Sequence, residues 1–254
     1  MKKWTEVSAG DINAANQRLW AEIGDNAEDT ARRINTDPVF VAKVARFMAN
    51  GGCESSTLQK LAREIMGKNF FGIEDAIKYL GIKPTKQQLA CLNVVPWGDD
   101  VLEFCKDTHI LVAVFPLSIL DIRTHVYEQF IQTIFFSQDW YDKQVFAKIK
   151  SQVGWHLIRK RPVANSTSEI WNFQQNLLSR NEKTPNARIM VYAMVGHFIV
   201  AKERILENVY VRCDDVCSDG GRVEVGSFDV EGLAIRSGDD GVCESHVGLA
   251  AARK

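Results

Sequence analysis

The C-terminal part of this 254-residue chain lacks six residue types. Residues 209–254 contain no Asn, Gln, Thr, Pro, Met or Trp, and their only Lys is the last residue. The preceding 208 residues contain 13 Asn. The same 46 residues nevertheless hold 7 of the 17 Gly and 3 of the 6 Cys. Such a bias indicates positions chosen for variety rather than for a catalytic role.

Patterns that identify common chemistries are also absent from the chain. It has no HExxH, Walker A, GxGxxG or GxSxG motif. No CxxC or paired Cys/His spacing predicts a structural zinc site. The six Cys are scattered, so we expect free thiols in a reducing compartment rather than a disulfide framework. We therefore predict no metal and no cofactor.

Targeting signals and strong charge are missing as well. The N-terminus has no apolar core of a signal peptide, and no apolar run is long enough to span a bilayer, so a cytoplasmic location is the default expectation. The net charge is −1, with nine acidic and five basic side chains in residues 209–254, net −4, and +3 on the remainder. This balance indicates neither nucleic acid nor an anionic membrane as a partner.

Hydrophobic periodicity predicts an α+β chain, with a helical N-terminal region over 1–105 and a second domain over 106–254. Asp37-Pro38 should start an amphipathic helix that ends at Asn50-Gly51-Gly52. Further helices are expected over 58–66, 72–80, 140–150, 166–178 and 186–206, the last two capped by Ser166–Ser168 and by Thr184-Pro185. Strands are expected over 110–115, 118–123 and 154–158.

Residues 209–254 divide into a regular frame and irregular filler. The apolar frame residues are Val209, Val211, Val223, Val225, Phe228, Leu233, Ile235 and Leu249. The filler residues are Cys213, Asp214, Cys217, Gly221, Glu224, Ser227, Asp229, Ala234, Arg236, Ser237, Gly238 and residues 242–247. Every filler residue except Glu224 and Glu244 can be reached from an Asn codon by changing only its adenines, and Glu can be reached from a Lys codon in the same way. Adenine-directed mutagenesis would produce this bias, including the excess of Cys.

On these features the chain resembles the variable proteins of diversity-generating retroelements, in particular a microbial subgroup. The resemblance covers roughly residues 80–254 and rests on residues 107–123 (DTHILVAVFPLSILDIR), 153–158 (VGWHLI), 165–178 and the terminal GLAAARK. It implies a C-type lectin-like fold of the formylglycine-generating-enzyme type. In that fold 110–123 and 246–252 would be paired terminal strands, and helices at 139–150 and 186–206 would flank the sheet. It also implies that mutagenised copies of a template repeat replace the 3′ end of the gene.

The function implied by the resemblance is non-enzymatic recognition of a varying ligand, expected to be a protein. A face can vary when the folding energy lies elsewhere: large-to-small core substitutions cost about 2–5 kcal/mol, and surface ones usually stay within about 0.5 kcal/mol. The frame residues would supply the buried side, and the filler would face solvent. The predicted hypervariable binding face consists of Cys213, Asp214, Cys217, Gly221, Glu224, Ser227, Asp229, Ala234, Arg236, Ser237, Gly238, Val242, Cys243, Glu244, Ser245 and His246.

Two other functions remain open. One is a calcium-binding or structural interaction module with a fixed tail, since Asp214, Asp215, Asp219 and Gly220 resemble half of an EF-hand loop, although Gly226 stands where the bidentate Glu would be. The other is a cysteine-dependent enzyme of related fold, with Cys243 as nucleophile and His246 as base.

Several remaining residues are expected to be structural. These are His109, His125, His156 and His197 as structural or surface histidines, Trp171 and Phe173 as packing residues, and the basic cluster Arg159, Lys160 and Arg161 beside Trp155 as a solvated loop.

Overall fold

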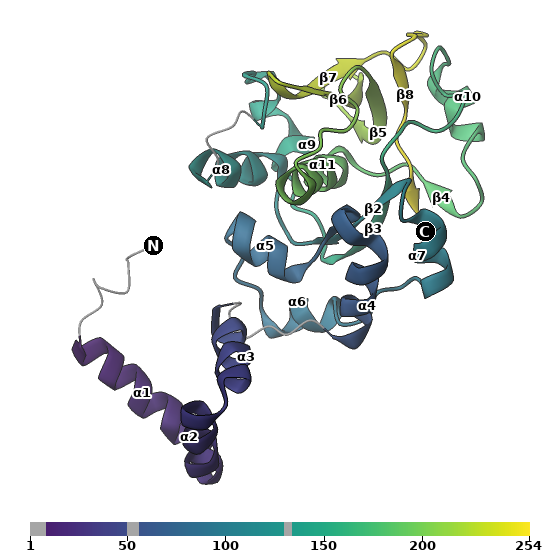
Figure 1. The fold of residues 1–254 in the computed structure, drawn as a ribbon. Coiled ribbons are helices and arrows are strands. Elements are labelled where there is room, and N and C mark those ends of the chain that lie inside the picture. The colour runs from purple at the N-terminus through teal and green to yellow at the C-terminus, as the bar shows by residue number, and fades with distance from the viewer. Residues whose placement is uncertain (1–8, 50–55, 130–133) are drawn as a thin grey trace. The chain divides into compact units, whose positions relative to one another are not determined.

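The computed structural model describes residues 9–49, 56–129 and 134–254 (Figure 1). Within these residues the chain is α+β, with helices and two mixed β-sheets. It divides into two compact units, Met1–Gly52 and Cys53–Lys254. None of the helices in the described ranges has both the length and the hydrophobicity needed to cross a membrane.

The first unit is helical. Its elements are α1 (Ala9–Ile23), the 3-10 turn η2 (Gly24–Asn26), α2 (Ala27–Thr36) and α3 (Pro38–Ala49). The carboxylate of Asp37 accepts hydrogen bonds from the backbone N–H groups of Val39 and Phe40, both at 3.0 Å, and so caps α3. The predicted helix start at Asp37-Pro38 is confirmed, while its predicted end at Asn50-Gly51-Gly52 lies outside the described residues.

The second unit contains all the strands that the structure describes. Its helices are α4 (Thr57–Met66), η3 (Gly67–Asn69), α5 (Ile73–Leu80), α6 (Lys86–Cys91), α7 (Asp99–Cys105), α8 (Ile119–Gln129), η4 (Trp140–Lys143), α9 (Val145–Lys148), α10 (Trp171–Asn176) and α11 (Ala187–Ala201). Its strands are β1 (Phe70–Phe71), β2 (His109–Val114), β3 (Gly154–Arg159), β4 (Glu182–Lys183), β5 (Tyr210–Val216), β6 (Arg222–Asp229), β7 (Gly232–Gly238), β8 (Val247–Leu249) and β9 (Ala252–Arg253). The helices predicted over 58–66 and 72–80 and the strands predicted at 110–115 and 154–158 are confirmed.

The strands form two sheets, of order β1-β2-β3-β9-β4 and β7-β6-β5-β8. In the first sheet only β1 and β2 are parallel, and in the second only β5 and β8. The C-terminal strands β8 and β9 belong to different sheets, and the buried residues Ala250 and Ala251 connect them. The last residues of the chain therefore join the two sheets.

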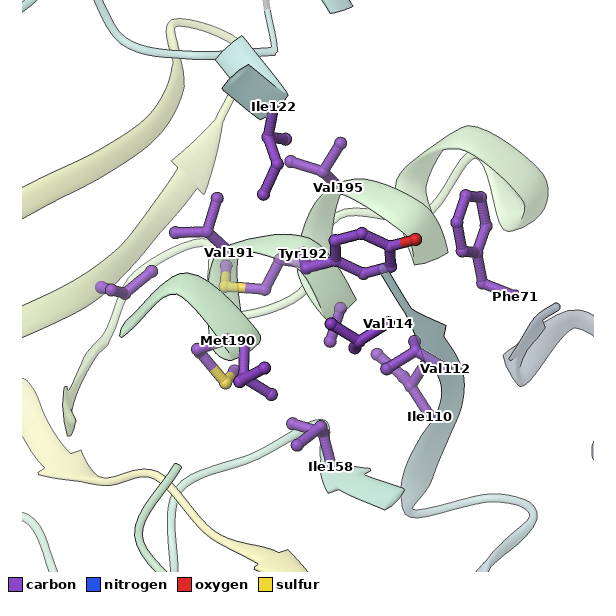
Figure 2. Packing of buried hydrophobic residues seen from close by; sticks show 14 of the residues in the cluster. Phe71, Ile110, Val112, Val114, Ile122, Ile158, Met190, Val191, Tyr192 and Val195 are labelled. Atoms are coloured by element: carbon purple, nitrogen blue, oxygen red, sulfur yellow. The ribbon is translucent and has the colours of Figure 1, made fainter. Parts of the chain in front are cut away.

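Helix α11 fills the space between the two sheets. Its buried residues are Ala187 and all of residues 189–199, and it contacts β1, β2 and β3 of one sheet and β5 and β6 of the other (Figures 1 and 2). A helix that is apolar on every side is stable only when it is buried on every side. Its single phenol is satisfied, because the hydroxyl of Tyr192 donates to the carbonyl of Ala113 at 3.0 Å.

The predicted pairing of the terminal strands is wrong. Strand β2 pairs with β3 and β1, and β9 pairs with β3 and β4, so β3 separates the two segments that were expected to be neighbours. Of the two helices predicted to flank the sheet, the one at 186–206 is present as α11. Residues 139–150 form only the short η4 and α9.

The predicted strand at 118–123 is wrong because a capping box starts helix α8 there. Ser118 Oγ accepts from the N–H of Asp121 at 3.1 Å, and Asp121 Oδ2 accepts from the N–H of Ser118 at 2.9 Å. Ile119, Ile122 and Val126 then lie buried on one side of the helix. The local hydrogen bonds outweigh the apparent alternation of the sequence.

Two predicted helix caps are used elsewhere in the fold. The hydroxyl of Ser166 donates to the carbonyl of Val163 at 2.6 Å and accepts from Leu249 N–H at 2.9 Å, so α10 begins only at Trp171. Thr184 pairs with the side chain of Gln175. Helix α11 is capped from another element, as described below.

The predicted domain boundary after residue 105 does not coincide with the division of the structure. Residues of α4, α5 and β1 belong to the same hydrophobic core as β2 and α11. Phe71 of β1, for example, packs edge-on against Tyr192 at 5.8 Å between ring centroids. The first compact unit is therefore limited to Met1–Gly52.

We expect Gly196→Ala to destabilise the second unit. A Cβ at Gly196 of α11 would lie 2.8 Å from Cγ of Phe71. The gain in helix propensity is about 1 kcal/mol, whereas overpacking a core costs about 1–3 kcal/mol. Urea unfolding of Gly196→Ala, of Phe71→Leu and of the double variant measures how the two effects combine in the free energy of unfolding. A double variant no more stable than the sum of the singles would contradict this packing account.

We also expect the protein to lose stability as pH falls from about 6.5 to about 4. Burial lowers the pKa of His109, His156 and His197 from 6.5 to about 4. Between these pH values the unfolded chain binds protons at these residues and the folded chain does not. The free energy of unfolding therefore falls as the pH falls. His109→Gln should make the decline in the free energy of unfolding shallower. Equal urea midpoints at the two ends of the range would refute the expectation.

Candidate ligand-binding face

The β7-β6-β5-β8 sheet has one buried and one outward face. Val211, Val223, Val225, Leu233 and Ile235 alternate along β5, β6 and β7 and lie in the core. Phe228 and Leu249 are buried too, and Val209 packs against the core. The expectation that the apolar frame supplies the buried side is confirmed.

A row of charged side chains crosses the outward face of this sheet. Strand register places Arg212 of β5 opposite Glu224 of β6, and Glu224 opposite Arg236 of β7. Glu224 accepts from Arg212 Nε at 3.2 Å and from Arg236 Nε at 2.6 Å. Opposite charges at cross-strand positions attract, and here both Arg212 and Glu224 are completely buried.

The guanidinium of Arg212 is fully hydrogen-bonded. Five N–H donors are available on an arginine, and five hydrogen bonds are formed. Besides Glu224 Oε1, its acceptors are Glu169 O at 3.1 Å, Gln174 Oε1 at 3.3 Å, Asp239 O at 3.0 Å and Val242 O at 2.7 Å. One buried cation thus fixes the 239–242 loop and the segment before α10 to the sheet.

The charged row continues outward from Arg236. Its Nη2 donates to Glu244 Oε2 at 2.8 Å, and His246 Nε2 lies 3.2 Å from the same oxygen. Arg236 also lies 4.4 Å over the ring of Tyr210. The hydrogen bond from Arg236 lowers the pKa of Glu244, which favours its carboxylate form.

A second arginine organises the end of the face near the β5–β6 turn. Arg222 donates to both carboxylate oxygens of Asp240, at 3.0 and 2.7 Å, and lies 3.8 Å over the ring of Trp171. A pocket of about 440 Å³ opens beside it, lined by residues 219–221 and 237–240.

Thirteen of the sixteen predicted face residues are exposed or partly exposed. The structure brings Gly221, Glu224, Arg236, Ser237, Gly238 and residues 242–246 together around the charged row and the pocket. Ser227 and Asp229 lie farther along β6 than Glu224, by about 10 and 17 Å at the usual rise per residue of a strand. Ala234 lies between these groups, opposite Gly226, and Asp214 is exposed on β5.

The expectation that the filler faces solvent is wrong for Cys213, Cys217, Glu224 and Val247. All four are buried. Cys213 alternates with the exposed Asp214 and therefore points into the core, and Glu224 is covered as the counterion of Arg212. Gly238 is also constrained, because a Cβ there would lie 2.2 Å from Glu224 Oε1.

Two of the carboxylates that a calcium site would require already form hydrogen bonds within the protein. Asp215 accepts from Ala187 N–H at 2.6 Å and pairs with Arg188, so it caps α11 from strand β5. Asp219 accepts from Gly221 N–H at 3.0 Å, as a turn residue does. In the described part of the chain, no three His, Cys, Asp or Glu side chains gather closely enough to hold a metal ion.

The cysteine alternative rests on Cys243, which is exposed in the 239–246 loop. The imidazole of His246 lies beside Glu244 and 6.2 Å from the ring of Tyr210. Burial raises the pKa of the thiols of Cys213 and Cys217, which disfavours the reactive thiolate at those two positions.

Comparison of the chain with known protein families, curated proteins and solved structures found no match.

Three elements of the face were not predicted from sequence. Arg212 and Arg222 stand next to the frame residues Val211 and Val223, and nothing in the sequence around them indicates that they organise the face. Trp171 is partly exposed and Phe173 is 53% exposed, so the prediction that both are packing residues is wrong for Phe173. The Ser168 and Trp171 N–H groups donate to Glu244 and Asp240 carbonyls, which aligns 168–171 with the 240–244 loop. The two aromatic residues Trp171 and Phe173 are the local signal that the sequence offers for this segment.

We expect Glu224→Gln to cost about 3–5 kcal/mol, since removing one partner of a buried ion pair leaves an uncompensated charge. Glu103→Gln is the matched control, because Glu103 pairs with Lys106 at 2.8 Å in an exposed pair worth about 0–1 kcal/mol. Urea unfolding of both variants gives the comparison. Similar losses in the two would show that Arg212 does not depend on Glu224.

Proposed function

We propose that this chain is a non-enzymatic ligand-binding protein whose C-terminal surface is diversified by retroelement-driven adenine mutagenesis. We further propose that its second unit contains a C-type lectin-like domain of the formylglycine-generating-enzyme type. One observation carries the proposal. The apolar frame of residues 209–254 lies in or against the core, while thirteen of the seventeen filler residues are accessible.

This division explains how such a surface tolerates variety. The inward residues of β5, β6 and β7 pack on α11 and the rest of the core. Exchanges of accessible side chains on the other face leave that packing intact, and such exchanges usually change stability by no more than about 0.5 kcal/mol. The residues that differ in chemistry are then free to determine what is bound.

The shape of the face favours a protein ligand. Its filler residues extend along the length of β6, about 20 Å, which matches the scale of a protein interface better than that of a small-molecule pocket. Exposed Ile170, Phe173 and Val242 supply apolar area beside the charged row. An apolar centre with a polar rim is the usual composition of a protein interface.

Sequencing the 3′ end of this gene and its neighbourhood across a natural population tests the proposal. We expect codons for filler residues such as Ser245 and His246 to differ between copies, and only where a nearby template repeat has adenines. The frame codons of Val223 and Val225 are the internal control and should be uniform. A reverse transcriptase gene should lie alongside.

Uniform filler codons and the lack of a repeat would overturn the proposal. Variation spread equally over frame and filler codons would also overturn it, because ordinary drift has no preference for template adenines. The exposed Asp- and Gly-rich turns would then belong to a fixed structural or interaction module.

A further inference from the structure

A second concave site lies between the end of α11 and the start of β5. It has a volume of about 510 Å³ and is lined by residues 160–162 and 203–209. None of the sixteen predicted face residues lines it. Its size is in the range of small-molecule binding sites, which run from about 300 to 1,000 Å³.

Three cationic side chains line this pocket: Lys160, Arg161 and Arg204. Among the residues that the structure describes, none of the three forms an ion pair with a carboxylate. Lys160 Nζ donates to the neutral Asn69 Oδ1 at 3.2 Å. Burial lowers the pKa of this ammonium, and the negative charges of Glu203 and Asp107 offset only part of that effect.

Arg204 is held by aromatic rings instead of by an anion. Its guanidinium carbon lies 4.6 Å from the ring of Phe198 and 5.6 Å from that of Phe228. Its Nε is buried and has no hydrogen-bond partner within the described residues. Stacking on two rings thus fixes the position of the guanidinium without an anionic partner among the described residues.

The pocket's own carboxylates form no ion pair with these three cations within the described residues, and Glu203 acts on Lys160 only at longer range. Glu203 pairs with Lys68, which compensates its charge. Glu207 is exposed. Below the pocket His197 is completely buried, its Nε2 is 3.7 Å from Glu203 Oε2, and neither ring nitrogen has a hydrogen-bond partner in the described part of the chain.

We propose that this pocket binds a small phosphate-bearing ligand. Lys160 and Arg204 are partly buried and form no ion pair within the described residues, so an anion in the pocket would stabilise them. Three cations match a group with more than one negative charge better than a monocarboxylate, and Arg and Lys side chains both suit phosphate oxygens. The site is independent of the ligand-binding face and does not rest on the function proposed for it.

Isothermal titration of inorganic pyrophosphate into the full chain at low ionic strength tests the site, with acetate as the comparison anion. Lys160→Met keeps the apolar stem and removes the charge, and Arg204→Gln removes the second cation. Lys83→Met is the matched control, because Lys83 is exposed and outside the pocket lining. We expect pyrophosphate to bind the wild type, and its dissociation constant to rise about tenfold or more in each pocket variant and to stay unchanged in the control.

Three results would overturn the proposal. Absence of pyrophosphate binding to the folded wild type would remove the site. Equal weakening by Lys83→Met and Lys160→Met would show that the anion is attracted by diffuse surface charge. Acetate binding as tight as that of pyrophosphate would contradict the phosphate class. If a buried-residue variant does not fold, Arg161→Gln changes an exposed lining residue and gives the same test.

Discussion

The second unit depends on the burial of α11 on all its sides. The helix has almost no polar surface to offer to solvent, so it is stable only with both sheets in place. The β7-β6-β5-β8 sheet completes this enclosure with its apolar side and turns its other side outward. The separation between a core that must be kept and a face that can change follows from this one requirement.

Much of this separation could be predicted from the sequence. Two segments, 110–115 and 186–206, are too hydrophobic to lie on the surface, and both are buried. The alternation of Val223, Val225, Leu233 and Ile235 identifies the buried side of β6 and β7. Local capping was harder to predict. The same Ser, Thr and Asp side chains can cap a neighbouring helix or bond to a distant backbone group. The tertiary structure decides between the two, as at Ser166 and Asp215.

The charged row could not be predicted because its existence depends on strand register. Charged residues are almost never fully buried unless they are paired, so single residues such as Arg212 and Glu224 are expected at the surface. Register brings them face to face, and the 239–242 loop then covers them. The side chain of Glu224 consequently fills the space beside Gly238, and its charge is balanced in part by that of Arg236. Variation at any of these three positions is coupled to the others.

The complete hydrogen bonding of the Arg212 guanidinium has a consequence for how the face would bind a ligand. Because the guanidinium fixes the carbonyls of Asp239 and Val242, the backbone of the neighbouring loop is already ordered before any ligand arrives. The entropy that flexible loops lose on association is then largely removed from the cost of binding. Side chains at 243, 245 and 246 can be exchanged on this rigid support. Variants of such a surface would differ mainly in how long a complex persists, rather than in how fast it forms.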